Sequence, residues 1–167
     1  MRIGIVSDCH GDCRRLREAL RVLRQRGAEA VVHCGDIGST KCVRALGAAG
    51  VPAYLVLGNT DRRVAELQRA ARDAGVRLEG ETAELAVDGE RRLAAAHGHD
   101  DAVLNELVLE GRFAYLCHGH AHRRRDERIG GVRIISPGSL HRPRCGPHAT
   151  CALLDTQQES VEFIELP

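Results

Sequence analysis

Several features that would direct a functional assignment are missing from this sequence of 167 residues. No apolar run approaches the roughly 18 residues that a membrane-spanning helix requires, which argues against a function within a membrane. The apolar residues 1–7 are interrupted at once by Asp8 and His10, so they lack the length and order of a signal peptide. We therefore expect a cytoplasmic protein with no membrane partner.

An excess of charge is also missing, because 24 Lys and Arg residues balance 23 Asp and Glu residues, for a formal net charge of +1. This balance gives no global reason to expect a nucleic-acid, membrane or acidic partner. Residues 123–128 are rich in arginine but contain interleaved acids, so we interpret them as a solvated turn. No specific nucleic-acid partner is predicted, and function must come from local sites.

Paired Cys-x-x-Cys spacing is absent, although the chain has seven cysteines, which argues against a zinc finger or ribbon. These are Cys9, Cys13, Cys34, Cys42, Cys117, Cys145 and Cys151. We expect reduced and mostly buried thiols. A redox or metal sensor is the alternative, and it would bind zinc through thiolates and lose it after alkylation.

Hydrophobic residues make up 43% of the chain, enough for one domain spanning residues 1–167 with a real core. Apolar patterns predict buried strands at 3–6, 30–33 and 51–57, each followed by a helix. Further strands are predicted at 82–87, 92–97, 113–117, 132–135, 149–155 and 161–166, with a helix around 103–108. This α/β beginning and β-rich ending predict two packed sheets with helices outside.

Side chains of the types that bind metals gather where the predicted strands end. The clusters are Asp8-Cys9-His10, Gly35-Asp36, Gly58-Asn59-Thr60-Asp61, His97-Gly98-His99 and His118-Gly119-His120-Ala121-His122. Open α/β sheets bind ligands beyond the carboxyl ends of their strands, so these loops are expected to converge. Nitrogen and carboxylate ligands suit Mn, Fe, Co, Ni or Zn.

In this order and spacing, the clusters resemble the signature of the calcineurin-like metallophosphoesterase superfamily: Asp-x-His, Gly-Asp, Gly-Asn-His-Asp/Glu, His and Gly-His-x-His. The loop Pro137-Gly138-Ser139, followed by Arg142-Pro143-Arg144, resembles that of the small prokaryotic phosphodiesterase branch. The resemblance covers essentially the whole chain. It implies an α/β fold of four layers, an αββα sandwich in which helices flank two packed mixed β-sheets.

The resemblance also implies a cofactor of two divalent metal ions, with Mn as the first expectation and Ni, Co, Fe or Zn as alternatives. One ion would be bound by Asp8, His10, Asp36 and His122. The other would be bound by Asp36, Asn59, His97 and His120. Asp36 would then bridge the two ions, and a water molecule between them would attack the phosphorus of a small phosphodiester.

Asp36 and His99 are the predicted catalytic residues, and Asn59 and His99 the predicted substrate-binding residues. His99 is expected to hydrogen-bond the phosphoryl group or the leaving oxygen. Thr60 stands where much of the superfamily has a histidine that can act as general acid, which leaves protonation of the leaving group open. Asp61, without that histidine beside it, is expected to brace its loop.

Other functions stay open at this point. The chain could be a non-catalytic metal-binding scaffold for other proteins, as in a eukaryotic retromer subunit of the same branch, or a phosphomonoesterase or dinucleoside polyphosphate hydrolase. A homodimer is possible, because edge strands of small domains can pair. His33 and His118 are interpreted as packed side chains rather than ligands. His141 and His148 match no motif, so we expect them at the surface without a role.

Overall fold

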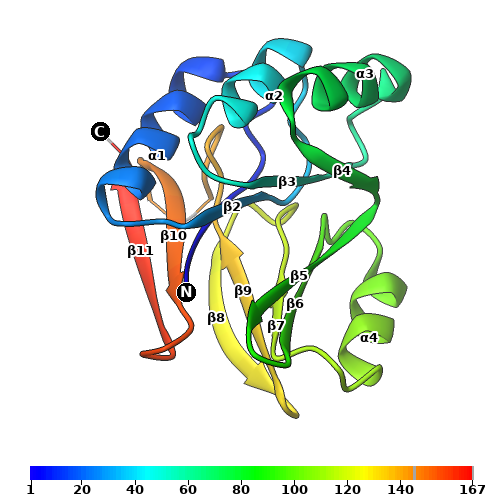
Figure 1. Ribbon diagram of the computed structural model, residues 1–167, viewed down its shortest axis with the longest axis vertical. Helices are drawn as coiled ribbons and strands as arrows, with labels where there is room; N and C mark the ends of the chain where they lie inside the picture. The colour runs from blue at the N-terminus through cyan, green and yellow to red at the C-terminus, as the bar shows by residue number, and fades with distance from the viewer. Residues whose placement is uncertain (145, 167) are drawn as a thin grey trace.

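The computed structural model describes residues 1–144 and 146–166, so Cys145 lies outside the described residues. Within these ranges, one sheet has the strand order β11-β10-β1-β2-β3-β4 (Figure 1). Its strands are β1 (Arg2–Val6), β2 (Ala30–His33), β3 (Ala53–Val56), β4 (Arg77–Gly80), β10 (Ala149–Asp155) and β11 (Ser160–Leu166). The first four are parallel, whereas β10 runs antiparallel to β1 and to β11.

The second sheet has the strand order β5-β6-β7-β9-β8. Its strands are β5 (Thr82–Asp88), β6 (Arg91–Ala96), β7 (Tyr115–Cys117), β8 (Arg124–Ile129) and β9 (Val132–Pro137). Strands β6, β7 and β9 are parallel to one another, and β5 and β8 pair antiparallel at the two edges. Both sheets are therefore mixed, as the sequence predicts.

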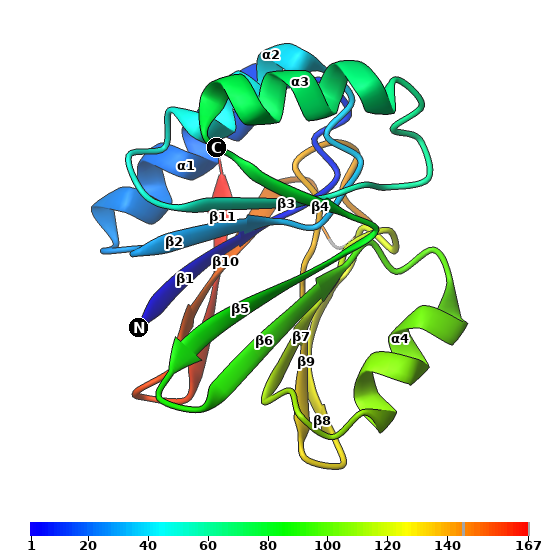
Figure 2. The ribbon, with the colours of Figure 1, turned by 45° about the vertical axis from the view of Figure 1, so that its right-hand side comes forward.

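Helices cover the outer face of each sheet (Figure 2). They are α1 (Cys13–Gln25), α2 (Thr40–Gly47) and α3 (Val64–Ala74) on the first sheet and α4 (Asp101–Leu109) on the second. Local sequence explains where these helices begin, because the side chains of Asp12, Ser39 and Asp100 accept hydrogen bonds from first-turn amides of α1, α2 and α4. None of the helices in the described ranges is long and apolar enough to cross a membrane.

Alternating side chains along the strands produce the layers. Ile3 and Ile5 of β1 face the second sheet and join a core formed between the two sheets. Gly4 and Val6 face the helices, and a Cβ atom on Gly4 would lie only 2.8 Å from Cδ1 of Leu23 in α1. The predicted αββα sandwich is confirmed.

Two strands differ from the sequence prediction. Residues 123–128 do not form a solvated turn, because β8 occupies Arg124–Ile129 and pairs with β9. Its side chains are mostly exposed, so its charged composition is compatible with an edge strand held by main-chain hydrogen bonds. The short strand β4, in which exposed and half-buried residues alternate, was also not predicted.

Candidate functional site

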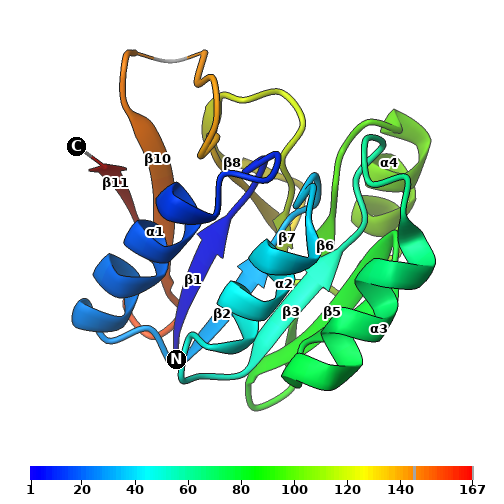
Figure 3. The same cartoon turned by 90° about the horizontal axis from the view of Figure 1, so that it is seen from above.

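The predicted ligands lie in loops that follow the carboxyl ends of strands in both sheets. The loops after β1, β2 and β3 come from the first sheet, and those after β6 and β7 from the second. Figure 3 shows the loop after β1 from above. Main-chain hydrogen bonds hold the loops together, since the Asp8 amide donates to the Gly35 carbonyl at 3.1 Å and the Gly119 amide donates to the His97 carbonyl at 2.9 Å.

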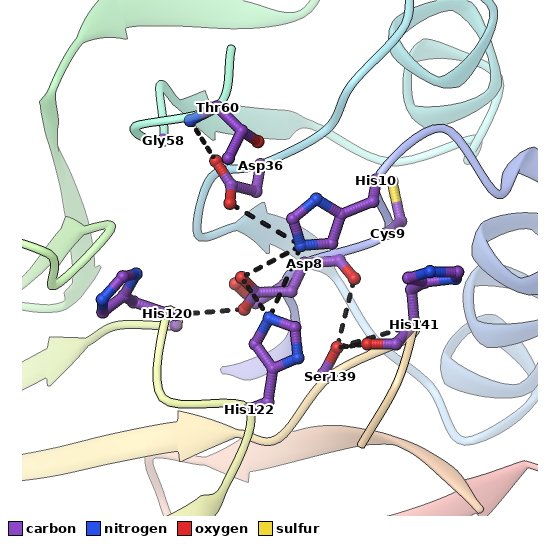
Figure 4. Close-up of polar contacts among 12 residues, drawn as sticks. Asp8, Cys9, His10, Asp36, Gly58, Thr60, His120, His122, Ser139 and His141 are labelled. Carbon is purple, nitrogen blue, oxygen red and sulfur yellow. Dashed lines mark hydrogen bonds and ion pairs between the residues drawn. The ribbon is translucent and has the colours of Figure 1, made fainter. Parts of the chain in front are cut away.

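Asp8, His10 and His122 form one cluster (Figure 4). Nε2 of His122 lies 3.3 Å from Oδ1 of Asp8, and Nε2 of His10 lies 3.5 Å from Nε2 of His122. The Asp8 side chain is fully buried, and its Oδ1 atom has no hydrogen-bond donor among the described residues. A buried carboxylate oxygen without a donor fits a cation ligand, because leaving it unpaired is costly.

Asp36 connects this cluster to His97. Its Oδ2 atom lies 3.6 Å from Nε2 of His10 and 3.4 Å from Nε2 of His97. Nε2 of His97 also lies 3.1 Å from Oδ1 of Asn59. Oδ2 of Asp36 is thus near residues of both predicted ligand sets. The other oxygen, Oδ1, accepts a hydrogen bond from the Thr60 amide at 2.9 Å.

His120 and His99 lie on the His97 side of the site. The rings of His97 and His120 are 5.2 Å apart, and those of His97 and His99 are 5.6 Å apart, measured between centroids. The His120 ring lies apart from His10 and His122, across the Asp8 carboxylate (Figure 4). His99 is exposed, so the structure brings it to the rim of the site rather than to its centre.

The backbone at the site is strained. Five of the predicted ligands have a left-handed conformation that non-glycine residues rarely adopt. They are Asp8, His10, Asp36, His120 and His122, with φ values of 55°, 45°, 55°, 63° and 54°. Such strain persists only where surrounding contacts impose it, and its concentration here indicates that the folded chain fixes these five side chains in position.

Supporting hydrogen bonds orient the imidazoles. Nδ1 of His97 donates to the Cys34 carbonyl at 2.8 Å, and Nδ1 of His122 donates to the Arg142 carbonyl at 3.0 Å. Each bond leaves Nε2 unprotonated and directed at a carboxylate when the ring is neutral, which is the form that binds a metal. Asp61 braces its loop as expected, accepting hydrogen bonds from the Gly38 and Gly58 amides at 2.8 Å and 2.9 Å.

Two glycines allow the loops to meet. A Cβ atom on Gly58 would lie 2.1 Å from Oδ1 of Asp36, and one on Gly119 would lie 1.9 Å from Oγ of Ser7. Both distances are far below van der Waals contact. Glycine at these two positions therefore follows from the close approach of the backbone to the candidate ligands and their neighbours.

Opposite charges at the site shift the pKa values of its groups. Burial alone would raise the pKa of the Asp36 carboxyl, but hydrogen bonds from His97 and the Thr60 amide lower it overall. Burial alone would also raise the pKa of Asp8, but the adjacent His122 imidazole lowers it overall. Both carboxylates are ionised at neutral pH and can bind cations.

A cavity of about 650 Å³ opens onto the site. His10, Asp36, Asn59, Thr60, His120, His122, His141, Arg142 and Arg144 line it. His141, expected at the surface without a role, is half-buried and lines this cavity: its amide donates to the Asp8 carbonyl at 3.1 Å, and its ring lies 5.8 Å from that of His10. This contact depends on residues 138–144 returning beside β1, which no local motif could indicate. His148 is exposed, as expected.

The remaining polar residues near the site have structural contacts. His33 is fully buried with Nε2 3.4 Å from Sγ of Cys9, and Cys9 in turn donates to the Ile37 carbonyl at 3.2 Å. Nδ1 of His118 donates to the Gly119 carbonyl at 3.1 Å. His33 and His118 are thus packed, and Cys9 is buried away from the ligands, as the sequence predicts.

Comparisons with known proteins agree with this geometry. The calcineurin-like phosphoesterase superfamily domain matches residues 1–159. A phosphodiesterase of Methanocaldococcus jannaschii is 26% identical over 170 residues, which cover 99% of each chain. A probable metallophosphoesterase of Bacillus subtilis is 27% identical over 170 residues, covering 96% of this chain and 88% of the relative.

Solved structures share the architecture. An archaeal phosphodiesterase superposes with a TM-score of 0.90 at 26% identity, over 99% of this chain and 100% of the other. A phosphoesterase from E. coli, at 22% identity over the full length of both chains, has a TM-score of 0.70 and shows the shared fold alone. The family match covers every strand except β11 and every loop of the candidate site, and this chain belongs to the calcineurin-like phosphoesterase superfamily.

Proposed function

We propose that the protein is a phosphodiesterase that depends on two divalent metal ions. The observation that carries the proposal is the position of Asp36, whose Oδ2 atom lies 3.6 Å from Nε2 of His10 and 3.4 Å from Nε2 of His97. The two histidines come from different sheets, and a single carboxylate between them suits the shared ligand of a two-metal site.

Asp8, His10, Asp36 and His122 would hold one ion, and Asp36, Asn59, His97 and His120 the other. Bound divalent cations supply an acidified water as nucleophile and positive charge for the phosphoryl oxygens. The donor set of imidazoles and carboxylates suits Mn, Ni, Co, Fe or Zn, and we propose Mn first. The donor-free Oδ1 atom of Asp8 supports a cation on the His10 side of Asp36.

The protein's own groups would bind and orient the substrate. Arg142 and Arg144 line the cavity, and their guanidinium groups have no hydrogen-bond or ion-pair partner in the described ranges, which suits an anionic ligand. We assign to His99 a hydrogen bond to the phosphoryl group or the leaving oxygen, and to Asn59 a contact with a phosphoryl oxygen. The Thr60 hydroxyl is a poor proton donor at neutral pH, so diesters with good leaving groups would react fastest.

Preference for a diester over a monoester is supported by the M. jannaschii relative and the archaeal structure, both described as phosphodiesterases. The test uses purified, metal-stripped protein, to which Mn, Ni, Co, Fe, Zn or Mg is added singly. Hydrolysis of bis-p-nitrophenyl phosphate is measured beside that of p-nitrophenyl phosphate. A His148→Ala variant, altered at an exposed histidine outside the site, controls for nonspecific effects of histidine removal.

Turnover of the diester that returns with metal, and exceeds that of the monoester, is expected. A preference for the monoester would replace the substrate class with phosphomonoesters. If folded protein gave no turnover with any ion, the catalytic proposal would fail and a metal-binding interaction scaffold would be the better assignment.

A further inference from the structure

A second cavity, of about 420 Å³, lies beside the metal-site cavity. Its lining comprises Gly11, Gly38, Ser39, Thr40, Lys41, Thr60, Asp61, Arg62, Arg63 and Leu67. Thr60 belongs to the walls of both cavities. The Thr60 amide also donates a hydrogen bond to Oδ1 of Asp36. The second cavity therefore lies next to the residue that we propose as the ligand of both metal ions. Each volume is in the range of about 300–1,000 Å³ that is common for small-molecule sites.

The second cavity has a positive wall. Lys41 and Arg62 are exposed, and neither side chain has a hydrogen-bond or ion-pair partner among the described residues. The third cation, Arg63, is bound to Glu66. The Asp61 carboxylate accepts hydrogen bonds from the Gly38 and Gly58 amides and forms no ion pair with Lys41 or Arg62.

Many other arginines of the described residues form ion pairs with acidic side chains. Arg112 binds Glu84 and Glu110, and Arg133 binds Asp126. Lys41 and Arg62 come instead from the first turn of α2 and from the loop before α3, two segments that meet at this cavity. Two cations converging from different elements can bind one anionic group, since each contributes charge and donors that no acidic side chain of the described residues engages.

Part of the cavity lining carries no polar side chain. Leu67 is only 3% exposed, and Gly11 and Gly38 present backbone without side chains. An ester arm with a carbon framework could lie against this part of the lining while its anionic end reached Lys41 and Arg62. The cavity is therefore suited to an organic group that ends in an anion, rather than to a free inorganic ion.

We propose that the second cavity binds one ester arm of the substrate and that this arm carries a further phosphate. The substrate class is then a small phosphodiester with a terminal phosphate monoester, for which a 5′-phosphorylated dinucleotide is a suitable probe. The scissile phosphate lies at the metal site, and the terminal phosphate binds Lys41 and Arg62. This inference rests on the proposed phosphodiesterase function for its reaction, but the binding site itself can be tested separately.

The first experiment measures kcat/KM of the metal-reconstituted protein for three diesters: 5′-phosphorylated diadenylate, diadenylate without the phosphate, and bis-p-nitrophenyl phosphate. The wild type should prefer the phosphorylated dinucleotide to the unphosphorylated one by at least tenfold. The double variant Lys41→Ala/Arg62→Ala should lose that preference and retain its kcat/KM for the other two diesters within about twofold. The matched control Arg69→Ala/Arg72→Ala removes two exposed cations from α3, outside the cavity lining, and should retain the preference.

The second experiment measures equilibrium binding of the two dinucleotides in the presence of a chelator, so that no turnover occurs. Tighter binding of the phosphorylated one, lost in the Lys41→Ala/Arg62→Ala variant alone, supports the site even if no diester is hydrolysed, in which case the proposed function fails. Equal binding of both dinucleotides by the wild type overturns the inference even if bis-p-nitrophenyl phosphate is hydrolysed. An equal loss with all three diesters in the first experiment would overturn it too.

Discussion

Nε2 of His122 lies 3.3 Å from Oδ1 of Asp8, which makes an ion pair whenever His122 is protonated. This contact raises the pKa of His122, and the hydrogen bond with Asp36 raises that of His97 despite its burial. In the metal-free protein, the ion pair of His122 is present at low pH and is lost as the pH rises through its raised pKa. A proton and a metal ion thus compete for the same nitrogen atoms.

Metal affinity should consequently increase with pH. Because both pKa values lie above the ordinary histidine value of about 6.5, the affinity for Mn should rise by about tenfold or more between pH 6 and pH 8. Competition with a fluorescent chelator measures the affinity, and a weakly buffered solution reports proton release on addition of Mn. A constant affinity over this range, without proton release, would contradict the assignment of these histidines as ligands.

The substitution Asp36→Asn should remove the charge of the proposed shared ligand while keeping its size. We expect loss of bound metal and a reduction in the turnover of bis-p-nitrophenyl phosphate of about 10²-fold or more. Metal content per protein molecule and kcat are the measurements, with circular dichroism to establish folding. The control is Asp126→Asn, at a half-exposed carboxylate on β8 that binds Arg133. Full activity of Asp36→Asn would eliminate the two-metal mechanism.

Gly58→Ala should displace Asp36 without removing any ligand. The added Cβ atom would lie 2.1 Å from Oδ1 and 2.4 Å from the amide nitrogen of Asp36, so one of the two loops must move. Metal retention should fall strongly and thermal stability should decrease. Gly131→Ala is the matched control, since a Cβ atom there meets no atom within 4 Å, and it should behave as wild type. Equal metal retention by the two variants would refute this steric account.

His33 should make the stability of the protein sensitive to acid. Its complete burial lowers its pKa to about 4, against the opposing charges of Asp61 and Asp8. In the unfolded chain His33 binds a proton near pH 6.5, whereas in the folded chain it binds one only near pH 4. The free energy of unfolding is therefore unaffected by His33 above pH 6.5 and decreases as the pH falls towards 4. The loss attributable to this residue is on the order of 3 kcal/mol.

Urea unfolding of metal-free wild type and His33→Phe at pH 7.5, 5.5 and 4.5 measures this effect. The variant removes the titrating ring nitrogens and keeps an aromatic side chain, so its stability should decrease less between pH 7.5 and pH 4.5. Parallel decreases in the two proteins would show that acid acts through other groups.

Thiol alkylation should leave the metal in place. Among the six described cysteines, five are buried and Cys13 is half-buried, so iodoacetamide should modify Cys13 before the other five under native conditions. The proposed ligands are carboxylates, imidazoles and an amide, and bound metal should be unchanged after this reaction. Mass spectrometry locates the modified residue, and metal analysis follows retention. Release of metal in proportion to alkylation would favour the alternative of a thiolate-based sensor.

The buried part of the fold could be predicted from sequence because burial leaves a pattern. The apolar residues of β1 and β2, and the polar clusters directly after them, indicated both the strands and the edge where the site lies. The edge strands β4 and β8 left no such pattern, since hydrogen bonds to β3 and β9 hold them while their side chains largely face solvent.

Within the site, the residue types could be predicted and the loop geometry could not. His141 approaches His10 because main-chain hydrogen bonds join residues 140–141 to Ser7 and Asp8 in the loop after β1, and such long-range pairing has no local signal. The second cavity was hidden for the same reason. Lys41 and Arg62 lie in separate sequence segments, neither of which contains a recognisable motif. Only the folded chain brings the two side chains to one cavity.

The distribution of the candidate ligands between two sheets has a mechanical consequence. Asp8, His10, Asp36 and Asn59 follow strands of one sheet, whereas His97, His120 and His122 follow strands of the other. Ions held by both groups would act as a clasp across the sandwich, resisting any sliding of one sheet over its neighbour. Amide hydrogen exchange at the inner strands of both sheets should therefore slow together when metal is added, because the bound ions would hold the two sheets to each other at the end where the site lies.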